Sequence, residues 1–295
     1  MKNLFLFIIG LMTVVASAQD NPNVSTIMVG DIEISLLSEG QGTGRSNIFV
    51  GATSEMIQQC LPDGVYPNSC NAFLVRMQGK NILIDTGYGR ALLKNLKSLG
   101  VAPEQINAVL ITHVHGDHIG GMLTDGQAVF PNAELYLSKA EHEFSMNGSE
   151  RNTGARNVIE AYKSRLHLFE PKEINAGPEP LFDGIRAVAA YGHTPGHTLY
   201  MVESGDKKLL VWGDLTHAMA IQMPYPQVAM TYDTNPEMAV VARKKVLEYV
   251  AANNIQIAGM HIAFPGIGYI TKATENGYSF FEIPKLRQLI QDQVY

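Results

Sequence analysis

Four side chains that can bind metal ions lie close together near the middle of the chain. His113, His115, Asp117 and His118 belong to the stretch ITHVHGDHIGG, residues 111–121. Side chains at positions i and i+2 of an extended segment point the same way, so the first two histidines can bind one ion together. Gly116 allows the chain to turn, which leaves Asp117 and His118 free to face a second ion. Imidazole and carboxylate ligands suit zinc and its first-row neighbours, so the cluster predicts a metal site rather than a polar surface turn.

Three further ligand candidates follow predicted strands. His193 follows AVAAYG and opens HTPGHT, Asp214 follows LLVWG, and His261 follows IQIAGM. Loops at the ends of strands often carry ligands, so we expect these residues to meet the first cluster. Two shells that share Asp214 are predicted: His113, His115 and His193 in one, and Asp117, His118 and His261 in the other.

The segments around these candidates predict a chain of mixed α and β structure. Strands are predicted over residues 26–37, 71–77, 81–85, 108–112, 133–137, 185–190, 198–203, 208–212, 255–260 and 269–283, and helices over 54–59, 91–99, 236–252 and 285–294. The polar stretch 139–165 is expected to be helical and exposed, and the Gly-rich residues 40–44 to form a flexible turn. No linker or repeat divides residues 19–295, so one mixed domain is predicted.

The composition describes an ordinary globular protein. The chain has 295 residues, of which 46% are hydrophobic and 17% charged, so it can bury a sizeable core. Its net charge is −6 and no basic cluster is present, so we expect no nucleic-acid partner.

Residues 1–18 are typical of a secretory signal peptide. Lys2 precedes an apolar core from Leu4 to Val15, and Ala16-Ser17-Ala18 forms a small-x-small cleavage site. The apolar core is short for a membrane span, so no stable membrane anchor is expected, with an uncleaved anchor as the alternative. The prediction is a periplasmic or secreted protein cleaved after about Ala18.

Cys60 and Cys70 are the two cysteines of the chain. An oxidising compartment permits them to pair, and a bridge over so short a loop would stabilise the fold by roughly 3 kcal/mol if it were unstrained. Two free thiols are the alternative, since Cys70 lies at the head of a predicted strand.

The order of these motifs resembles that of the metallo-β-lactamase superfamily. The resemblance covers a hairpin ending in Asp85-Thr86-Gly87, then HVHGDH, GHTPGHT, GD and the last histidine. It implies an α+β fold, an αββα sandwich of two mixed sheets flanked by helices, with a dinuclear site at the sheets' edges. Two divalent ions are expected, zinc in the first place and manganese, cobalt or iron as alternatives. The resemblance makes Asp85 structural and His197 a supporting residue rather than a ligand.

A dinuclear site of this kind implies hydrolysis by a metal-bridging hydroxide. Asp117 is expected to be catalytic as well as a ligand, because it can pass the hydroxide proton to the leaving group. True β-lactamases of the superfamily usually replace the bridging aspartate by cysteine or serine, so Asp214 favours esters, lactones or phosphoesters. No GxSxG motif of a serine hydrolase is present.

Residues 242–270 resemble the branch that contains secreted N-acyl-homoserine lactonases and methyl parathion hydrolases. Many of these lactonases place a tyrosine three residues beyond the bridging aspartate, where this chain has His217. A neutral imidazole there could donate a hydrogen bond to the substrate carbonyl, or it could merely pack near the site. Both interpretations of His217 stay open at this point.

The expected substrate is a small hydrophobic ester or lactone. Residues that could wall its apolar groove are His217 together with Met122, Met223, Tyr225 and Phe264. The sequence thus predicts a secreted N-acyl-homoserine lactonase that acts in quorum quenching. The alternatives are an organophosphate or aryl-ester hydrolase with the same site and, more remotely, a non-catalytic metal-binding protein. Family resemblance also suggests a homodimer, and His142 and His167 are expected to be solvent-exposed.

Overall fold

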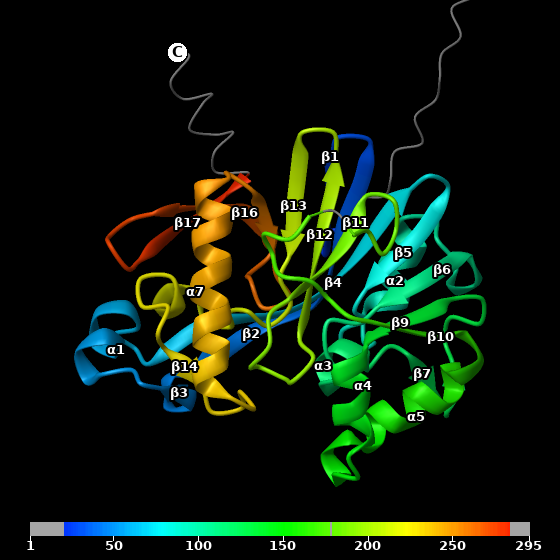
Figure 1. Ribbon diagram of the computed structural model, residues 1–295, viewed down its shortest axis with the longest axis horizontal. Helices are drawn as coiled ribbons and strands as arrows, with labels where there is room; N and C mark the ends of the chain where they lie inside the picture. Colours follow the sequence, from blue (N-terminus) through cyan, green and yellow to red (C-terminus); the bar gives the residue numbers. More distant parts are fainter. Residues whose placement is uncertain (1–20, 178, 284–295) are drawn as a thin grey trace, which may run out of the picture.

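The computed structural model describes residues 21–177 and 179–283, and it consists of two β-sheets packed face to face with helices on both outer faces (Figure 1). The predicted signal peptide and the helix predicted over 285–294 lie outside the described residues. The expected α+β sandwich of two mixed sheets is confirmed. None of the described helices is long and apolar enough to cross a membrane.

The first sheet has the strand order β1-β2-β4-β5-β6-β9-β10. Its strands are β1 (Val24–Val29), β2 (Ile32–Arg45), β4 (Val65–Met77), β5 (Lys80–Ile84), β6 (Ile106–Leu110), β9 (Glu134–Ser138) and β10 (Leu166–Phe169). The second sheet has the order β11-β12-β13-β15-β16-β17. Its strands are β11 (Ile185–Ala189), β12 (Thr198–Ser204), β13 (Lys207–Val211), β15 (Gln256–Ala258), β16 (Ile267–Lys272) and β17 (Tyr278–Glu282).

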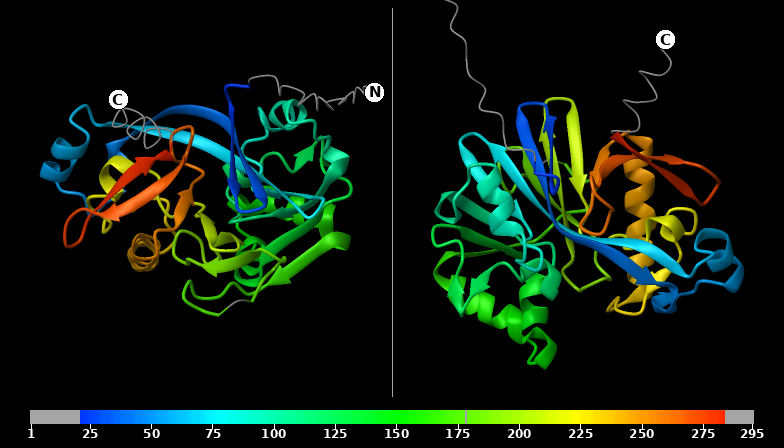
Figure 2. Two further views of the ribbon diagram at one scale, coloured as in Figure 1. Left: turned by 90° about the horizontal axis from the view of Figure 1, so that it is seen from above. Right: turned by 180° about the vertical axis from the view of Figure 1, so that it is seen from behind.

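The helices are α1 (Ser54–Cys60), α2 (Leu92–Ser98), α3 (Gly116–Ile119), α4 (Lys139–Met146), α5 (Thr153–Tyr162), α6 (Met219–Gln222) and α7 (Pro236–Ala252). The two outer faces are covered by α2, α4 and α5 on the first sheet and by α7 on the second (Figures 1 and 2). Two short strand pairs, β3 (Phe49–Val50) with β14 (Ala229–Met230) and β7 (Leu123–Thr124) with β8 (Gln127–Ala128), complete the described structure. Helix α7 begins where it was predicted to begin, because Asn235 caps it by accepting a hydrogen bond from the Met238 N–H and Pro236 occupies its first turn.

Three apolar layers hold the sandwich together. Ile34, Phe73 and Leu110 of the first sheet pack against Tyr200 and Val202 of the second, and all five are fully buried. A second layer lies between the first sheet and helices α2 and α5, and a third between the second sheet and α7. Burial of one such side chain contributes roughly 1.5–3 kcal/mol, so the sheets form a firm base for the loops at their edge.

The ligand candidates follow strands that run in parallel. Strands β5, β6 and β9 are parallel neighbours in the first sheet, and β13 and β15 are parallel in the second. The carboxyl ends of parallel strands lie at one edge of a sheet, which is where ligands usually bind. Four ligand candidates follow β6, and the others follow β11, β13 and β15, so the fold collects them at one edge.

The prediction of a flexible turn at residues 40–44 is wrong. These residues continue β2, which pairs with β4 as far as Arg45 opposite Val65 and extends past the sheet toward α1 (Figure 2). Side chains alternate along a strand, so the three glycines share one face. The cross-strand pairs on that face are Gly40 with Cys70, Gly42 with Asn68 and Gly44 with Tyr66.

The segment 139–165 is helical as expected, but it is not wholly exposed. Helix α5 buries Ala155, Val158, Ile159 and Tyr162 against the first sheet. The apolar positions of α5 recur at helical spacing, and this pattern was obscured by the charged residues between them.

Candidate metal centre

Three ring nitrogens converge on one point at the edge of the sandwich. The Nε2 atom of His113 lies 2.9 Å from Nδ1 of His115 and 3.1 Å from Nε2 of His193, and the last two nitrogens are 3.0 Å apart. Around a tetrahedral zinc ion with bonds of about 2.0–2.1 Å, ligand nitrogens are about 3.3 Å apart. The three nitrogens therefore fit one face of a metal shell.

A second group of ligand atoms faces the same space from the other side. The Nε2 atoms of His118 and His261 lie 3.8 and 3.7 Å from the two carboxylate oxygens of Asp117. Gly116 does more than allow a turn, because it begins helix α3, with His115 as the N-cap residue. The change from extended to helical backbone directs Asp117 and His118 away from His113 and His115.

Asp214 lies between the two groups. Its Oδ2 atom is 3.2 Å from Nε2 of His193, and its Oδ1 atom is 3.1 Å from Nε2 of His118 and 3.2 Å from Nε2 of His261. The buried atoms Oδ1 of Asp214 and Nε2 of His118 have no hydrogen-bond partner. Buried polar atoms rarely lack partners, so these two fit a cation that would coordinate both. The structure thus brings all seven predicted ligands together in the predicted halves.

Each buried ligand histidine is held by its second ring nitrogen. These contacts join Nδ1 of His113 to Oγ1 of Thr112 (3.1 Å), Nδ1 of His118 to Oδ2 of Asp85 (2.6 Å), Nδ1 of His193 to Oδ1 of Asp233 (2.8 Å) and Nδ1 of His261 to the carbonyl oxygen of Ser69 (2.7 Å). Such partners orient the imidazole rings and make them stronger metal ligands.

Asp85 supports the site rather than contributing a ligand atom, which agrees with the structural role expected for it. Its carboxylate also accepts hydrogen bonds from the backbone N–H and the hydroxyl of Thr112. The Asp85 backbone is left-handed, with φ of 56°, a conformation that aspartate tolerates better than most residues. Asp85 therefore ties the end of β5 to the loop that carries the histidine cluster.

The charges of the site favour a cation. Burial lowers the pKa of His115 to about 4 and the pKa of His113 well below its usual value, so both rings are neutral and can offer lone pairs. Burial also lowers the pKa of His193, but Asp214 and Asp233 outweigh it and raise the pKa to about 9. Binding of a cation requires the unprotonated ring, so a metal ion would displace that proton.

A buried glutamate joins two of the ligand loops. The carboxylate of Glu141 accepts hydrogen bonds from the Val114 N–H (3.0 Å), the Thr194 hydroxyl (2.7 Å) and the Gly196 N–H (3.0 Å). Burial raises the pKa of this carboxyl group. One side chain thus fixes the loop after β6 against the loop after β11.

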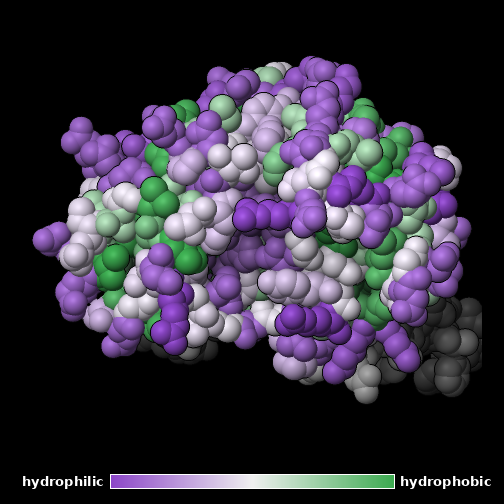
Figure 3. Space-filling model, turned by 90° about the horizontal axis from the view of Figure 1, so that it is seen from below, coloured by the Kyte–Doolittle hydropathy of each residue, from purple (hydrophilic) through white to green (hydrophobic). Residues whose placement is uncertain are grey.

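The metal ligands open onto a cavity of about 300 Å³. Figure 3 looks onto this side of the molecule and shows a central hollow among hydrophilic side chains. Besides five of the ligands, the lining residues are Gly44, Ile48, Tyr66, Asn68, Tyr88, His217 and Tyr232. The Tyr232 ring lies edge-on to His217 and His193, with centroids 4.9 and 5.9 Å apart.

His217 contacts the cavity and Asp214 at once. Its Nε2 atom is 2.8 Å from Oδ2 of Asp214, while its Nδ1 atom is buried without a partner. Burial lowers the pKa of His217 to about 4, so the ring is neutral and carries one N–H. The observed contact uses Nε2 to hold the carboxylate that lies between the two groups of ligand atoms.

The four apolar residues expected to wall the substrate do not line this cavity. Met122 is fully buried under helix α5, and Met223 is buried beside α7, so both are core residues. Tyr225 packs near α1 and donates a hydrogen bond to Gln59, while Phe264 packs against the layer between the sheets. The expectation was wrong because an apolar residue near a ligand in sequence is equally suited to the core.

Other sequence expectations can be placed as well. His197 is a supporting residue, since its Nε2 atom accepts a hydrogen bond from the Asp214 N–H. The residue before Asp214 must be a glycine, because the φ angle of Gly213 is 54° and a Cβ atom there would lie 2.4 Å from the His197 ring. His167 is exposed, whereas His142 is half-buried. Cys60 and Cys70 are both free thiols.

Asp233, Glu141 and Tyr232 were missed in the sequence. Asp233 and Glu141 lie 40 and 53 residues from the His193 and Thr194 side chains that they contact. No spacing pattern connects them. The one signal in the sequence was that Asp233 and Glu141 each lie near a predicted helix start, and acidic residues there are usually explained by helix capping.

Sequence comparison supports the same assignment as this geometry. Residues 65–252 match the family model described as "Metallo-beta-lactamase superfamily". The probable metallo-hydrolase YqgX of Bacillus subtilis is 30% identical over 154 residues, which cover 51% of this chain and 68% of YqgX. The acyl-coenzyme A thioesterase MBLAC2 of Bos taurus is 24% identical over 225 residues, 70% of this chain and 80% of the relative. Rv2300c of Mycobacterium tuberculosis, 24% identical over 183 residues, is matched over only 56% of its own length.

Two solved structures resemble nearly the whole described chain. The hydrolase AbOPH, described as a member of the β-lactamase superfamily, is 29% identical with a TM-score of 0.81, covering 88% of this chain and 97% of that one. AidC, described as a dizinc quorum-quenching lactonase in complex with a product, is 28% identical with a TM-score of 0.79 and the same coverage.

Proposed function

Since the chain belongs to the metallo-β-lactamase superfamily, we propose that this metallo-hydrolase cleaves carboxylic esters and that N-acyl-homoserine lactones are its first candidate substrates. The observation that carries the proposal is the position of Asp214, whose two oxygens face two different groups of ligands. A site divided in this way suits two cations that share one water molecule.

The donor set fits divalent ions such as zinc. His113, His115 and His193 would hold one ion, Asp117, His118 and His261 the other, and Asp214 both. When bound, the two ions would activate a shared water molecule and polarise the scissile carbonyl. Manganese, cobalt and iron accept the same ligands, so metal analysis of the purified protein identifies the bound ions.

The residues of the chain have separate roles in this reaction. Water attacks the carbonyl carbon, the bond from that carbon to the alcohol oxygen breaks, and the proton lost by the water must reach the departing oxygen. Asp117 is placed to carry this proton, because its carboxylate is about a quarter exposed to the cavity at 23%, whereas Asp214 is buried at 3%. His217 holds Asp214 through Nε2, and the Tyr232 ring lies edge-on to His217 at the cavity wall.

Three observations agree with an N-acyl-homoserine lactone as substrate. AidC, at 28% identity over most of the chain, is described as a lactonase. An N-acyl homoserine lactonase of Bacillus is 27% identical over 109 residues, although these are only 37% of this chain. The cavity beside the ligands has an aromatic and apolar side, formed by Ile48, Tyr66 and Tyr232, that suits an acyl chain.

An organophosphate or aryl-ester hydrolase is the second candidate. The same ligands would serve a phosphoryl centre, and the tyrosines of the cavity would stack on an aryl leaving group. A non-catalytic metal-binding protein is a third and more remote candidate.

A substrate panel on the metal-replete protein distinguishes these functions. We expect kcat/KM to be highest for N-acyl-homoserine lactones, lower for aryl esters and lowest for methyl parathion. The opposite ranking would support the organophosphate hydrolase. Failure to cleave any member of the panel, with metal bound in full, would support the non-catalytic protein.

We also propose that the protein is exported and dimeric. Residues 1–18 carry the features of a signal peptide, and intact-mass measurement of the protein from a bacterial periplasm should give a chain that begins at Gln19. An uncleaved chain in the membrane fraction would contradict export. Light scattering of the purified protein tests the dimer, and a monomer mass at micromolar concentration would contradict it.

A further inference from the structure

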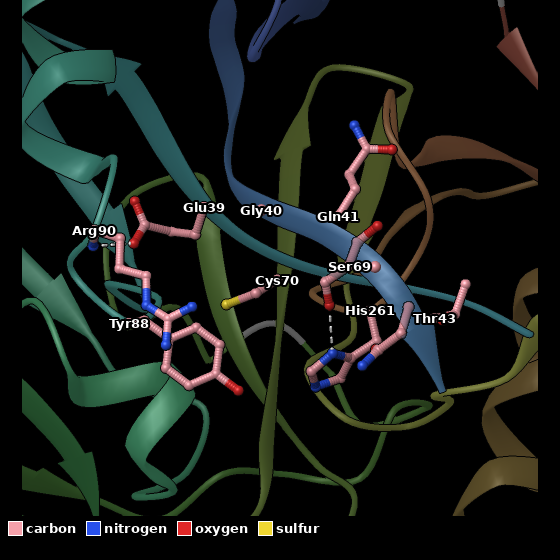
Figure 4. A pocket seen from close by; sticks show the side chains of 11 residues that line it. Glu39, Gly40, Gln41, Thr43, Ser69, Cys70, Tyr88, Arg90 and His261 are labelled. Carbon is pink, nitrogen blue, oxygen red and sulfur yellow. Dashed lines mark hydrogen bonds between the residues drawn. The ribbon is translucent and has the colours of Figure 1, made fainter. Parts of the chain in front are cut away.

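A second cavity, of about 190 Å³, adjoins the cavity of the metal centre (Figure 4). The two share Asn68, Tyr88 and His261 as lining residues. We call the second cavity the annex and define it by Glu39, Gly40, Gly42, Asn68, Tyr88 and Arg90. Because His261 belongs to both, a molecule bound at the metal centre on the Asp117 side can extend directly into the annex.

The annex exists because strand β2 has no side chains on the face that it turns to the site. A Cβ atom added at Gly40 or Gly42 would meet no heavy atom within 4 Å, so the space above them is open. A Cβ at Gly44 would lie 2.2 Å from the ring of Tyr66, so this glycine lets the ring approach the strand closely. The floor made by the three glycines therefore runs from the annex to the Tyr66 side of the metal cavity.

One uncompensated positive charge lies at the annex. The guanidinium carbon of Arg90 is 4.6 Å from the centroid of the Tyr88 ring, and Figure 4 shows the two side chains together at the cavity wall. Stacking on the ring limits the freedom of this exposed side chain. Among residues 21–177 and 179–283, no carboxylate lies within ion-pair distance of the Arg90 guanidinium.

Glu39 does not satisfy this charge, although it lines the same cavity. The register of β2 shifts between Ser38 and Gly40, so Glu39 occupies a β-bulge that turns its side chain toward the start of helix α2. Its two carboxylate oxygens accept hydrogen bonds from the backbone N–H groups of Arg90 (2.6 Å) and Ala91 (2.9 Å). The Glu39 carboxylate is therefore occupied by the backbone, and the guanidinium of Arg90 is left for a ligand.

We propose that the annex is a substrate subsite in which Arg90 binds a carboxylate on one arm of the ester while the ester group lies at the metal centre. This inference rests on the proposed hydrolytic function of that centre. The apolar arm of such a substrate lies at the opposite end, beside Tyr66 and Ile48. A simple N-acyl-homoserine lactone has no such carboxylate, so the subsite adds anionic esters and lactones to the substrates proposed above. Guanidinium groups bind carboxylates by two parallel hydrogen bonds, which gives this contact directional specificity.

Binding of small carboxylic acids to the metal-replete protein tests the subsite without any turnover. Succinate, glutarate and adipate would each be compared by calorimetry with the monocarboxylate of equal chain length. The affinity of the monocarboxylate measures binding at the metal centre alone. In a diacid of suitable length, the second carboxylate can also reach Arg90. We expect the best diacid to bind about tenfold more tightly than its monocarboxylate, the effect of one charge-assisted hydrogen bond pair.

Two variants assign this difference to the annex. Arg90→Gln should abolish it, whereas Lys94→Gln, which removes an exposed cation from α2, should preserve it. Gly42→Val should also abolish it by filling the annex, whereas Gly177→Val, at an exposed glycine that lines neither cavity, should preserve it. The proposal is overturned if no diacid binds more tightly than its monocarboxylate, or if Arg90→Gln retains the difference.

The lactone panel keeps the two proposals distinguishable. An Arg90-dependent difference in binding together with no cleavage of any ester would reject the hydrolase and retain the subsite. Cleavage of neutral lactones with no such difference would reject the subsite and retain the hydrolase.

Discussion

Oδ1 of Asp214 and Nε2 of His118 lie 3.1 Å apart, both buried and neither with a hydrogen-bond partner. Two such atoms would each bear a desolvation cost of about 1–3 kcal/mol if nothing lay between them. Although burial raises the pKa of Asp214, the imidazoles of His118 and His261 hold it well below its usual range, so the carboxylate is charged. A cation that both atoms coordinate removes the cost, and this is the simplest reason for the arrangement.

Replacement of the bridging carboxylate should disrupt both halves of the site. Asp214→Asn keeps the shape but removes the charge that faces His193 and His118. We expect bound metal to fall and kcat/KM to drop by more than the roughly 10–100-fold that loss of an outer partner costs. Metal analysis and lactone hydrolysis measure these effects. The exposed His167→Ala is the matched control, and an Asp214→Asn protein with full metal and full activity would contradict the bridging role.

Glu141 should matter although it touches no ligand atom. Glu141→Gln places an amide N–H₂ among three groups that donate hydrogen bonds to the carboxylate. We expect metal affinity to fall about 10–100-fold and the free energy of unfolding to fall by about 1–3 kcal/mol. Glu160→Gln, at an exposed ion pair with Lys163, should change neither. Equal metal affinities of the two variants would show that Glu141 does not position the loops.

His217 should act through Asp214. We expect His217→Ala to lower kcat about tenfold, with bound metal also reduced, because its Nε2–H no longer holds Oδ2 of Asp214. Glutamine at this position can still donate a hydrogen bond, so His217→Gln should recover part of the lost metal and rate. His217→Tyr distinguishes the alternative role: recovery of kcat by tyrosine but not by glutamine would indicate a hydrogen bond to the substrate carbonyl instead.

The metal ligands could be predicted from sequence because local geometry determines them. The pattern HVHGDH sets its own division into two halves, since an extended backbone carries His113 and His115 and the first turn of α3 carries Asp117 and His118. His193, Asp214 and His261 each follow a strand with a clear apolar run. Parallel strands then bring these loops to one edge without further information.

The shape of the substrate cavity could not be predicted in the same way. Gly40, Gly42 and Gly44 suggested a turn because glycine lacks a strong preference for strands. Their function depends on the register with Cys70, Asn68 and Tyr66, which only the tertiary structure provides. The prediction that Met122 lines the substrate cavity was wrong, because closeness to the ligands in sequence does not show whether a side chain faces the core or the cavity. Met122 is fully buried.

Removal and return of metal tests the central claim most directly. The protein would be treated with a chelator, dialysed and titrated with zinc while bound metal and N-hexanoyl-homoserine lactone hydrolysis are followed together. Two facing groups of ligands around Asp214 predict that activity disappears with the metal and returns in full only as the second equivalent binds. Undiminished hydrolysis by protein with no detectable metal would contradict the account.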